Sequence, residues 1–377
     1  MAGSFDDAMA RVAPLDQKAA AEAAVHHDRL TKPRGSLGRL ESLAVQLAGI
    51  SGTCPPSVPE PAAVAVFAGD HGVLAEGVSP WPQEVTAQMV ANFCSGGAAI
   101  NVLARHLGAE VVVVDVGVAS EVPGPAVASP ATGGPASPAV ATPAGTGLIS
   151  AKVRRGTRNL MVEPAMTRDE AVQALDVGAS VAGDLVAKGV RALVTGDMGI
   201  GNTTPSAALI AAFCGRSAGE VAGRGTGIGD AELQRKIAVI DAALTRARND
   251  PASDPLSTLA SLGGLEIAAL AGFIVGGAAA RVPVLIDGVI AAAAAVVAGS
   301  LAPGCVDYCV AGHRSTEPGS SIALEHLGLE PLLDLELRLG EGTGACLALG
   351  VLQAAAKVSA EMATFDSAGV TEKDATS

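Results

Sequence analysis

The sequence predicts an α/β fold built on a parallel β-sheet. Hydrophobic residues make up 49% of the 377 residues, aromatic residues only 2%, and 46 residues are glycine. A core of Ala, Val, Leu and Ile with abundant glycine favours helices packed closely on a parallel sheet over an aromatic-rich β-sandwich. Five short apolar runs alternate with helical patterns, and this alternation predicts right-handed crossovers between parallel strands.

The predicted elements begin and end with helices. Residues 6–50 are expected to be helical, because leucines and Ile50 recur there at helical spacing. After a proline-rich linker at residues 54–61, the predicted buried strands cover residues 63–68, 110–116, 192–195, 282–286 and 308–311. Helices are expected at residues 207–213, within 288–306 and at 346–363, and a fraying polar tail at 366–377.

One stretch, residues 119–147, has no periodicity. It is almost wholly Pro, Ala, Gly, Ser, Thr and Val, with Glu121 as its one charged residue. Such a composition is typical of a disordered or extended surface loop, so a disordered Pro/Ala-rich insertion is expected near residues 120–147.

Composition also narrows the class of function. The net charge of −13 argues against broad binding to a nucleic-acid backbone. The six cysteines form no CxxC pair and have no His or Cys partners at zinc spacing, so they are expected to be small buried hydrophobes. The first 25 residues lack the apolar core of a signal peptide, and the apolar run 288–306 contains Pro303. A cytoplasmic protein with a buried helix there, and no membrane span, is therefore expected.

Polar side chains follow nearly every predicted strand. They are Asp70 and His71, Asp115, Asp197, Asp287, and His313. Ligands of open parallel sheets bind at the carboxyl edge of the strands, so these ends together predict a catalytic crevice. Taken singly, each aspartate could instead cap the helix that follows it.

The segment 196–206 is the strongest candidate for binding an anion. It joins a predicted strand to a predicted helix, with Thr204 as N-cap and Pro205 at the first helical position. Its glycines and the N–H groups of the helix start could hold a phosphate or carboxylate beside Asp197. An ordinary tight turn is the alternative. Lys236 and Arg224 could each bind a phosphate. The alternatives are that Lys236 is a surface lysine and that Arg224 belongs to a hinge.

A second glycine-rich turn surrounds Glu341. A carboxylate there can reach a ligand and can have its pKa raised in a dry pocket, as a general base requires, or it can be a solvated acid. Gly340, Gly342 and Ala345 also fit a dinucleotide-binding pattern, but too few residues follow for the rest of that fold. Trp81 lies between two prolines and, with Gln88, could grip a flat heterocycle, although a core Trp is the alternative.

Seven motifs occur together and in order: KPRGSLG (32–38), FAGDHGV (67–73), EVT (84–86), GDMGIGNTT (196–204), LIDG (285–288), HRSTEP (313–318) and LRLGEGTGA (337–345). From about residue 30 to 352 the chain thereby resembles the nicotinate-nucleotide–dimethylbenzimidazole phosphoribosyltransferase family. The resemblance implies transfer of phosphoribose from nicotinate mononucleotide to 5,6-dimethylbenzimidazole in the lower-ligand branch of cobalamin biosynthesis. A non-catalytic binder of nucleotides or cobamide precursors with the same fold is the alternative.

The resemblance also implies roles for residues. Glu341 matches the family's general base, and Asp197 and Asp287 are candidates to stabilise positive charge on the ribose. Phosphate-binding candidates are Gly199, Gly201, Asn202, Thr203, Lys236 and Ser315. The base pocket is expected to contain Trp81, Gln88, Met198 and Leu339. No metal or cofactor is implied.

The family fold implied is a Rossmann-like parallel sheet with helices on both faces and a small helical domain from the two chain ends, assembled as a homodimer. The expected divisions are residues 1–60, a large domain at 61–330, and residues 331–377 with the catalytic turn and last helix. The chain departs from the family at Asp197, where Glu is common, and in most of residues 126–145, which resemble an insertion. Trp81 lies in a variable part of the base pocket, so the preferred base stays open.

Overall fold

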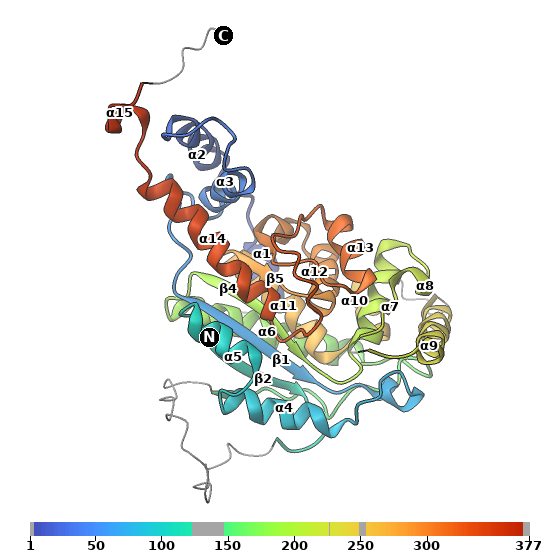
Figure 1. Ribbon diagram of the computed structural model, residues 1–377. Helices are drawn as coiled ribbons and strands as arrows, with labels where there is room; N and C mark the ends of the chain where they lie inside the picture. Colours follow the sequence, from blue (N-terminus) through green and yellow to red (C-terminus); the bar gives the residue numbers. More distant parts are fainter. Residues whose placement is uncertain (1–3, 123–146, 226, 249–253, 372–377) are drawn as a thin grey trace, which may run out of the picture.

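The computed structural model describes residues 4–122, 147–225, 227–248 and 254–371, and it confirms the predicted α/β class. Six parallel strands form one sheet in the order β3-β2-β1-β4-β5-β6 (Figure 1). The strands are β1 (Ala62–Gly69), β2 (Glu110–Gly117), β3 (Leu148–Ser150), β4 (Ala192–Met198), β5 (Val284–Ile286) and β6 (Cys309–Ala311). This is the Rossmann order, and the chain reverses its direction of winding between β1 and β4, where such folds bind ligands.

Helices cover both faces of the sheet, as expected from the resemblance (Figure 1). The sheet has a hydrophobic core on each face. Alternate side chains of β1 point into the two cores: Ala65 and Phe67 into one, Val64 and Val66 into the other. The helices are α1 (Phe5–Arg11), α2 (Gln17–Arg29), α3 (Arg39–Ser51), α4 (Glu84–Cys94), α5 (Ala99–His106), α6 (Arg168–Ala187), α7 (Thr203–Cys214), α8 (Ala218–Val221), α9 (Asp230–Arg248), α10 (Pro255–Leu262), α11 (Leu265–Ala279), α12 (Val289–Leu301), α13 (Pro318–Leu327), α14 (Thr343–Glu361) and α15 (Phe365–Ala368).

All five predicted strands are present, with ends that shift by at most three residues. The prediction missed β3, which pairs with β2 at the edge of the sheet. It has only three residues, and its two apolar ones, Leu148 and Ile149, are too few to mark a strand. Most of the predicted disordered stretch, residues 123–146, lies outside the described residues.

The predicted N-terminal helical segment is three separate helices. The first, α1, packs against α6 and α11, and its Phe5 N–H donates to Asp176 at 2.7 Å. In contrast, α2, α3 and the C-terminal half of α14 lie side by side away from the sheet (Figure 1). We propose that these three helices form the small domain. The tail expected to fray begins with the short helix α15.

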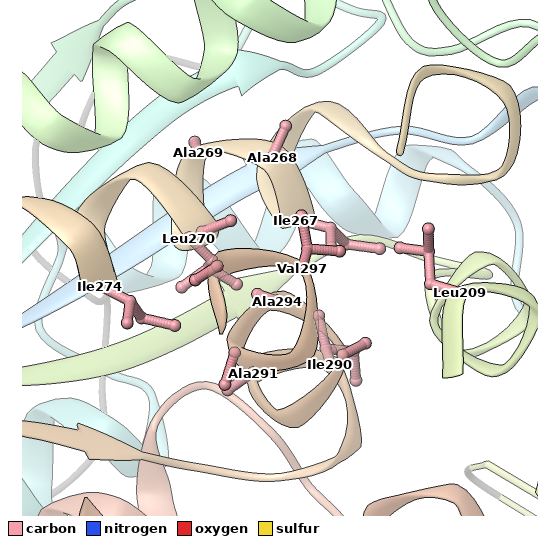
Figure 2. Close-up of a cluster of buried hydrophobic side chains, with 14 of the residues drawn as sticks. Leu209, Ile267, Ala268, Ala269, Leu270, Ile274, Ile290, Ala291, Ala294 and Val297 are labelled. Atoms are coloured by element: carbon pink, nitrogen blue, oxygen red, sulfur yellow. The ribbon is translucent and has the colours of Figure 1, made fainter. Parts of the chain in front are cut away.

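The largest core is built around α11 and α12 (Figure 2). The predicted buried helix within residues 288–306 is α12, and α11 is buried on all sides. Among the described residues, only α14 is long and apolar enough to cross a membrane by length and composition, and 56% of its apolar window is buried inside the fold. All six cysteines are free, and none of them is exposed.

Glycines bring the backbones of α6 and α11 into direct contact. A Cβ on Gly178 would lie 1.8 Å from the carbonyl oxygen of Ala269. We expect Gly178→Ala to lower the free energy of unfolding by about 3 kcal/mol, because the two helices must separate. Gly183→Ala on the same helix is the control, since that Cβ meets nothing within 4 Å. It should stabilise by about 0.5–1 kcal/mol. Denaturant unfolding of both variants would measure this, and equal midpoints would contradict the prediction.

Candidate active site

A cavity of about 380 Å³ opens at the carboxyl edge of the sheet, beside the ends of β1 and β4. This volume suits a small organic ligand. Ten of the predicted site residues line it: Trp81, Asp197, Met198, Gly199, Gly201, Asn202, Thr203, Lys236, Leu339 and Glu341. The two glycine-rich turns therefore meet at one cavity.

The β4–α7 turn (residues 198–203) forms one wall. Helix α7 starts earlier than predicted: its N-cap is Asn202, and Pro205 is its third residue. Proline is tolerated there because the first N–H groups of a helix have no partner within the helix. Gly199 lies against β1, where a Cβ would be 2.3 Å from the carbonyl oxygen of Gly69. Only glycine allows this contact, so the turn presents its backbone to the cavity.

Lys236 of α9 supplies a cation at the start of α7. Its Nζ donates to Oγ1 of Thr203 at 2.9 Å and to the carbonyl oxygen of Gly223 at 3.0 Å. Burial lowers the pKa of Lys236 to about 8, although the charge of Glu317 opposes this. An ammonium beside a helix N-terminus is suited to bind a phosphate.

Glu341 also lines the cavity, and it lies in a strained turn. Its φ of +63° is left-handed, and Gly340 and Gly342 on either side have φ of +82° and +92°. Left-handed backbone in a non-glycine residue costs free energy and is a mark of functional sites. The turn lies directly on β4, because a Cβ on Gly342 would be 2.9 Å from the carbonyl oxygen of Thr195.

The carboxyl group of Glu341 is suited to accept a proton. The residue is 6% exposed, and Oε2 has no hydrogen-bond partner within the described part of the chain. Burial raises the pKa of Glu341, and the charge of Asp287 adds to this, while a hydrogen bond with the backbone of Ile100 opposes it. A carboxylate with a raised pKa that borders a cavity can act as a general base near neutral pH.

Asp197 lies between the two turns. Its Oδ2 accepts a hydrogen bond from Nδ2 of Asn202 at 2.9 Å, whereas Oδ1 has no partner among the described residues. Burial and the charge of Asp287 raise the pKa of Asp197 well above its ordinary value. A positive charge placed beside it would favour its ionised form, so this carboxyl and a cation would stabilise each other.

Three predicted site residues do not line the cavity. Asp287 is fully buried beneath the Glu341 turn, where its Oδ2 accepts from Gly342 N–H at 3.1 Å and its Oδ1 from Ala345 N–H at 2.9 Å. Ser315 is buried, and its Oγ accepts from the N–H of Glu317 at 3.4 Å. Gln88 on α4 is exposed.

The apolar part of the cavity wall was only partly predicted. Trp81 is half exposed and lines the cavity with Leu339 and Met198. In place of Gln88, the residues of α4 that line it are Val85 and Met89. These two lie four residues apart on one face of the helix, and this spacing was the signal that could have found them.

The chain is similar to known proteins over nearly its whole length. A family model described as Phosphoribosyltransferase matches residues 12–370. The chain is 59% identical over 364 residues to a protein of Salinispora tropica, and the match covers 97% of this chain and 98% of the relative. It is 52% identical to a protein of Chloroflexus aggregans, and that match covers 96% of each chain. Both relatives are named nicotinate-nucleotide–dimethylbenzimidazole phosphoribosyltransferase. The crystal structure of CobT from Thermus thermophilus matches with a TM-score of 0.86 and 46% identity, over 94% of this chain and all of that one.

Proposed function

Because this chain belongs to the nicotinate-nucleotide–dimethylbenzimidazole phosphoribosyltransferase family, we propose that it transfers phosphoribose from nicotinate mononucleotide to 5,6-dimethylbenzimidazole. The products are α-ribazole 5′-phosphate and nicotinate, in the lower-ligand branch of cobalamin biosynthesis. The observation that carries the proposal is that the β4–α7 turn and Glu341 line the same cavity. One turn suits a phosphate and the other suits a proton-accepting carboxylate.

The reaction needs one base and no acid. The bond between C1′ and the ring nitrogen of nicotinate breaks, and its electron pair stays on that nitrogen, which leaves as a neutral ring. The unprotonated ring nitrogen of the benzimidazole forms the new bond to C1′, with inversion. The proton on its other nitrogen passes to the carboxylate of Glu341, whose raised pKa supports this role.

The other cavity residues are assigned by their chemistry. The backbone of Gly199 and Gly201, the side chains of Asn202 and Thr203, and the ammonium of Lys236 would hold the phosphate. Asp197, when ionised, would stabilise the positive charge that develops on the ribose. Trp81, Met89, Met198 and Leu339 would form the apolar walls around the incoming base.

Lys236 predicts how substrate binding depends on pH. Below a pKa of about 8 its ammonium attracts the phosphate, and above it the free enzyme must take up a proton to bind. We therefore expect KM for nicotinate mononucleotide to rise above this pH, by up to ~10-fold per pH unit. Steady-state kinetics across this range would measure the rise. Lys236→Arg, which stays charged, should abolish it. If KM of the unmodified enzyme does not change with pH in this range, Lys236 does not bind the phosphate.

A product assay tests the reaction itself. The enzyme is incubated with nicotinate mononucleotide and a panel of benzimidazoles and purines, and the products are read by mass spectrometry. Release of nicotinate together with a phosphoribosylated base is expected. Binding without turnover would instead support a non-catalytic binder. We also propose a cytoplasmic homodimer on the strength of the resemblance, and light scattering would measure the assembly.

A further inference from the structure

A fully buried ion pair lies beneath the cavity and takes no part in the chemistry above. Nε2 of His71, just after β1, is 2.7 Å from Oε1 of Glu266 in the first turn of α11, and both side chains are 0% exposed. Well-packed apolar residues often stabilise a core as much as a buried ion pair does, so stability is a weak reason for this one.

Glycines place this pair directly against the β4–α7 turn. A Cβ on Gly264 would lie 2.5 Å from Cε1 of His71, and a Cβ on Gly69 would lie 3.0 Å from Oε2 of Glu266. A Cβ on Gly199, in the turn itself, would lie 3.2 Å from Nε2 of His71. The imidazole and the carboxylate therefore fill the space under the backbone of Gly199.

A second polar connection holds the next residue of the turn. The N–H of Ile200 donates to Oγ1 of Thr86 at 3.1 Å, and Thr86 is fully buried on α4. The hydroxyl of Thr86 is hydrogen-bonded to the carboxyl of Asp70, which also accepts from the N–H of Ala119 at 2.7 Å. Since the Thr86 oxygen accepts from Ile200, its own proton points to Asp70.

We propose that His71–Glu266 and Asp70–Thr86 are positioning pairs that fix the β4–α7 turn for the phosphate of nicotinate mononucleotide. His71 supports Gly199 from below, and Thr86 holds the peptide of Ile200. None of the four residues is among those that line the cavity. The inference rests on the proposed function, and it explains why Asp70 and His71 follow β1. Backbone donors bind a phosphate well only when their direction is set in advance.

Thr86→Val tests the inference with little change of shape. It leaves the N–H of Ile200 and the carboxyl of Asp70 without their partner, so KM for nicotinate mononucleotide should rise ~10-fold or more. The KM for the base should change less than about threefold, because the apolar wall is intact. Thr86→Ser keeps the hydroxyl and should restore KM for nicotinate mononucleotide. Kinetics with each substrate varied, calorimetric binding of nicotinate mononucleotide and thermal unfolding would be measured together.

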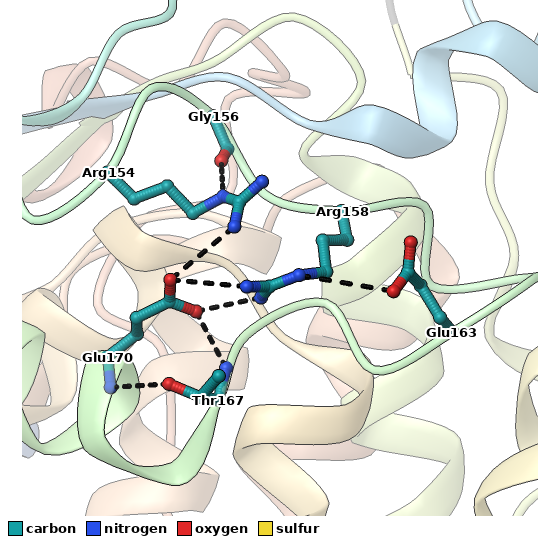
Figure 3. A network of polar contacts seen from close by, with 6 residues as sticks. All are labelled: Arg154, Gly156, Arg158, Glu163, Thr167 and Glu170. Carbon is teal, nitrogen blue, oxygen red and sulfur yellow. Dashed lines mark hydrogen bonds and ion pairs between the residues drawn. The ribbon is translucent and has the colours of Figure 1, made fainter.

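Glu266→Gln tests the His71–Glu266 pair, and it still tests the inference if Thr86→Val does not fold. It should raise KM for nicotinate mononucleotide and weaken the binding of this substrate measured by calorimetry. Its matched control is Glu170→Gln, because the polar partners of Glu170 are Arg158 at 2.8 Å, Arg154 at 3.4 Å and Thr167, none of which belongs to the β4–α7 turn (Figure 3). That control should lower Tm without changing either KM.

The outcomes separate the inference from the proposed function. If Thr86→Val and Glu266→Gln lower Tm but leave KM and binding of nicotinate mononucleotide unchanged, the positioning role is overturned. If Thr86→Ser fails to restore binding, the Thr86 hydroxyl is not the positioning group. If the unmodified enzyme binds nicotinate mononucleotide without turnover, the proposed function fails, while the calorimetric comparison still tests the role of the two pairs.

Discussion

Glu341→Gln is expected to lower kcat by ~10²–10⁴-fold, which is the usual contribution of a general base. Glutamine fills the same space and keeps a hydrogen-bonding group, but it cannot accept the proton of the incoming base. Binding of nicotinate mononucleotide should be unchanged, because its phosphate is assigned to the β4–α7 turn and Lys236, and not to Glu341. The expected loss is therefore confined to the chemical step.

The pH profile gives an independent readout of the same substitution. The base must be ionised to act, so kcat of the unmodified enzyme should fall as the pH drops through the raised pKa of Glu341. This acidic limb should be absent in Glu341→Gln. The control is Glu336→Gln, because Glu336 has a similar left-handed φ of +56° but is exposed and lies outside the cavity lining. Turnover like that of the unmodified enzyme in Glu341→Gln would remove the base from the mechanism.

Asp287→Asn is expected to reduce both stability and turnover. Its carboxylate accepts the N–H groups of Gly342 and Ala345, and Oδ1 is 3.4 Å from Nε2 of His313. Burial works to lower the pKa of His313, but its interaction with Asp287 raises the pKa overall. An asparagine would turn an NH₂ group toward one of these donors, so the free energy of unfolding should fall by about 2–4 kcal/mol. Because the Glu341 turn then shifts, kcat should fall ~10²-fold.

The combination of effects distinguishes two roles for Asp287. If Asp287 positions the Glu341 turn, its substitution should lower both the Tm and the kcat of the enzyme. If Asp287 acts on the ribose by its charge, its substitution should lower kcat alone. Thermal unfolding and single-turnover kinetics would separate them. The control is Asp254→Asn, since Asp254 caps α10 through the N–H groups of Leu256 and Ser257 at the surface. That variant keeps a capping oxygen, so it should cost less than about 1 kcal/mol, through its exposed pair with Arg168, and leave kcat unchanged.

The sheet and the positions of the two turns were predictable because they depend on local patterns. A buried parallel strand is a continuous apolar run, so β1, β2 and β4 could be found without knowing their neighbours. The start of α7 was misplaced because both Asn202 and Thr204 suit an N-cap, and the turn geometry decided between them. The edge strand β3 had no such pattern, because it has only three residues and its apolar run is two residues long.

Several roles depend on which side chains meet across the fold. The motif pattern drew attention to Asp287, but its burial under the Glu341 turn arises from the packing of α14 on the sheet. Gln88 and Met89 are adjacent in sequence, and the orientation of α4 alone decides which of them reaches the cavity. Glu266 sits in an otherwise apolar helix, so its pairing with His71 could not be read from spacing.

By itself, the sequence determined the α/β class, the family and the two glycine-rich turns, because strand periodicity, helix capping and ordered motifs are properties of neighbouring residues. Only the tertiary structure decided which polar groups border the cavity and which support it from below. Those assignments depend on contacts between residues far apart in the sequence, such as His71 and Glu266, which are 195 positions apart. Burial of such groups then shifts their pKa values.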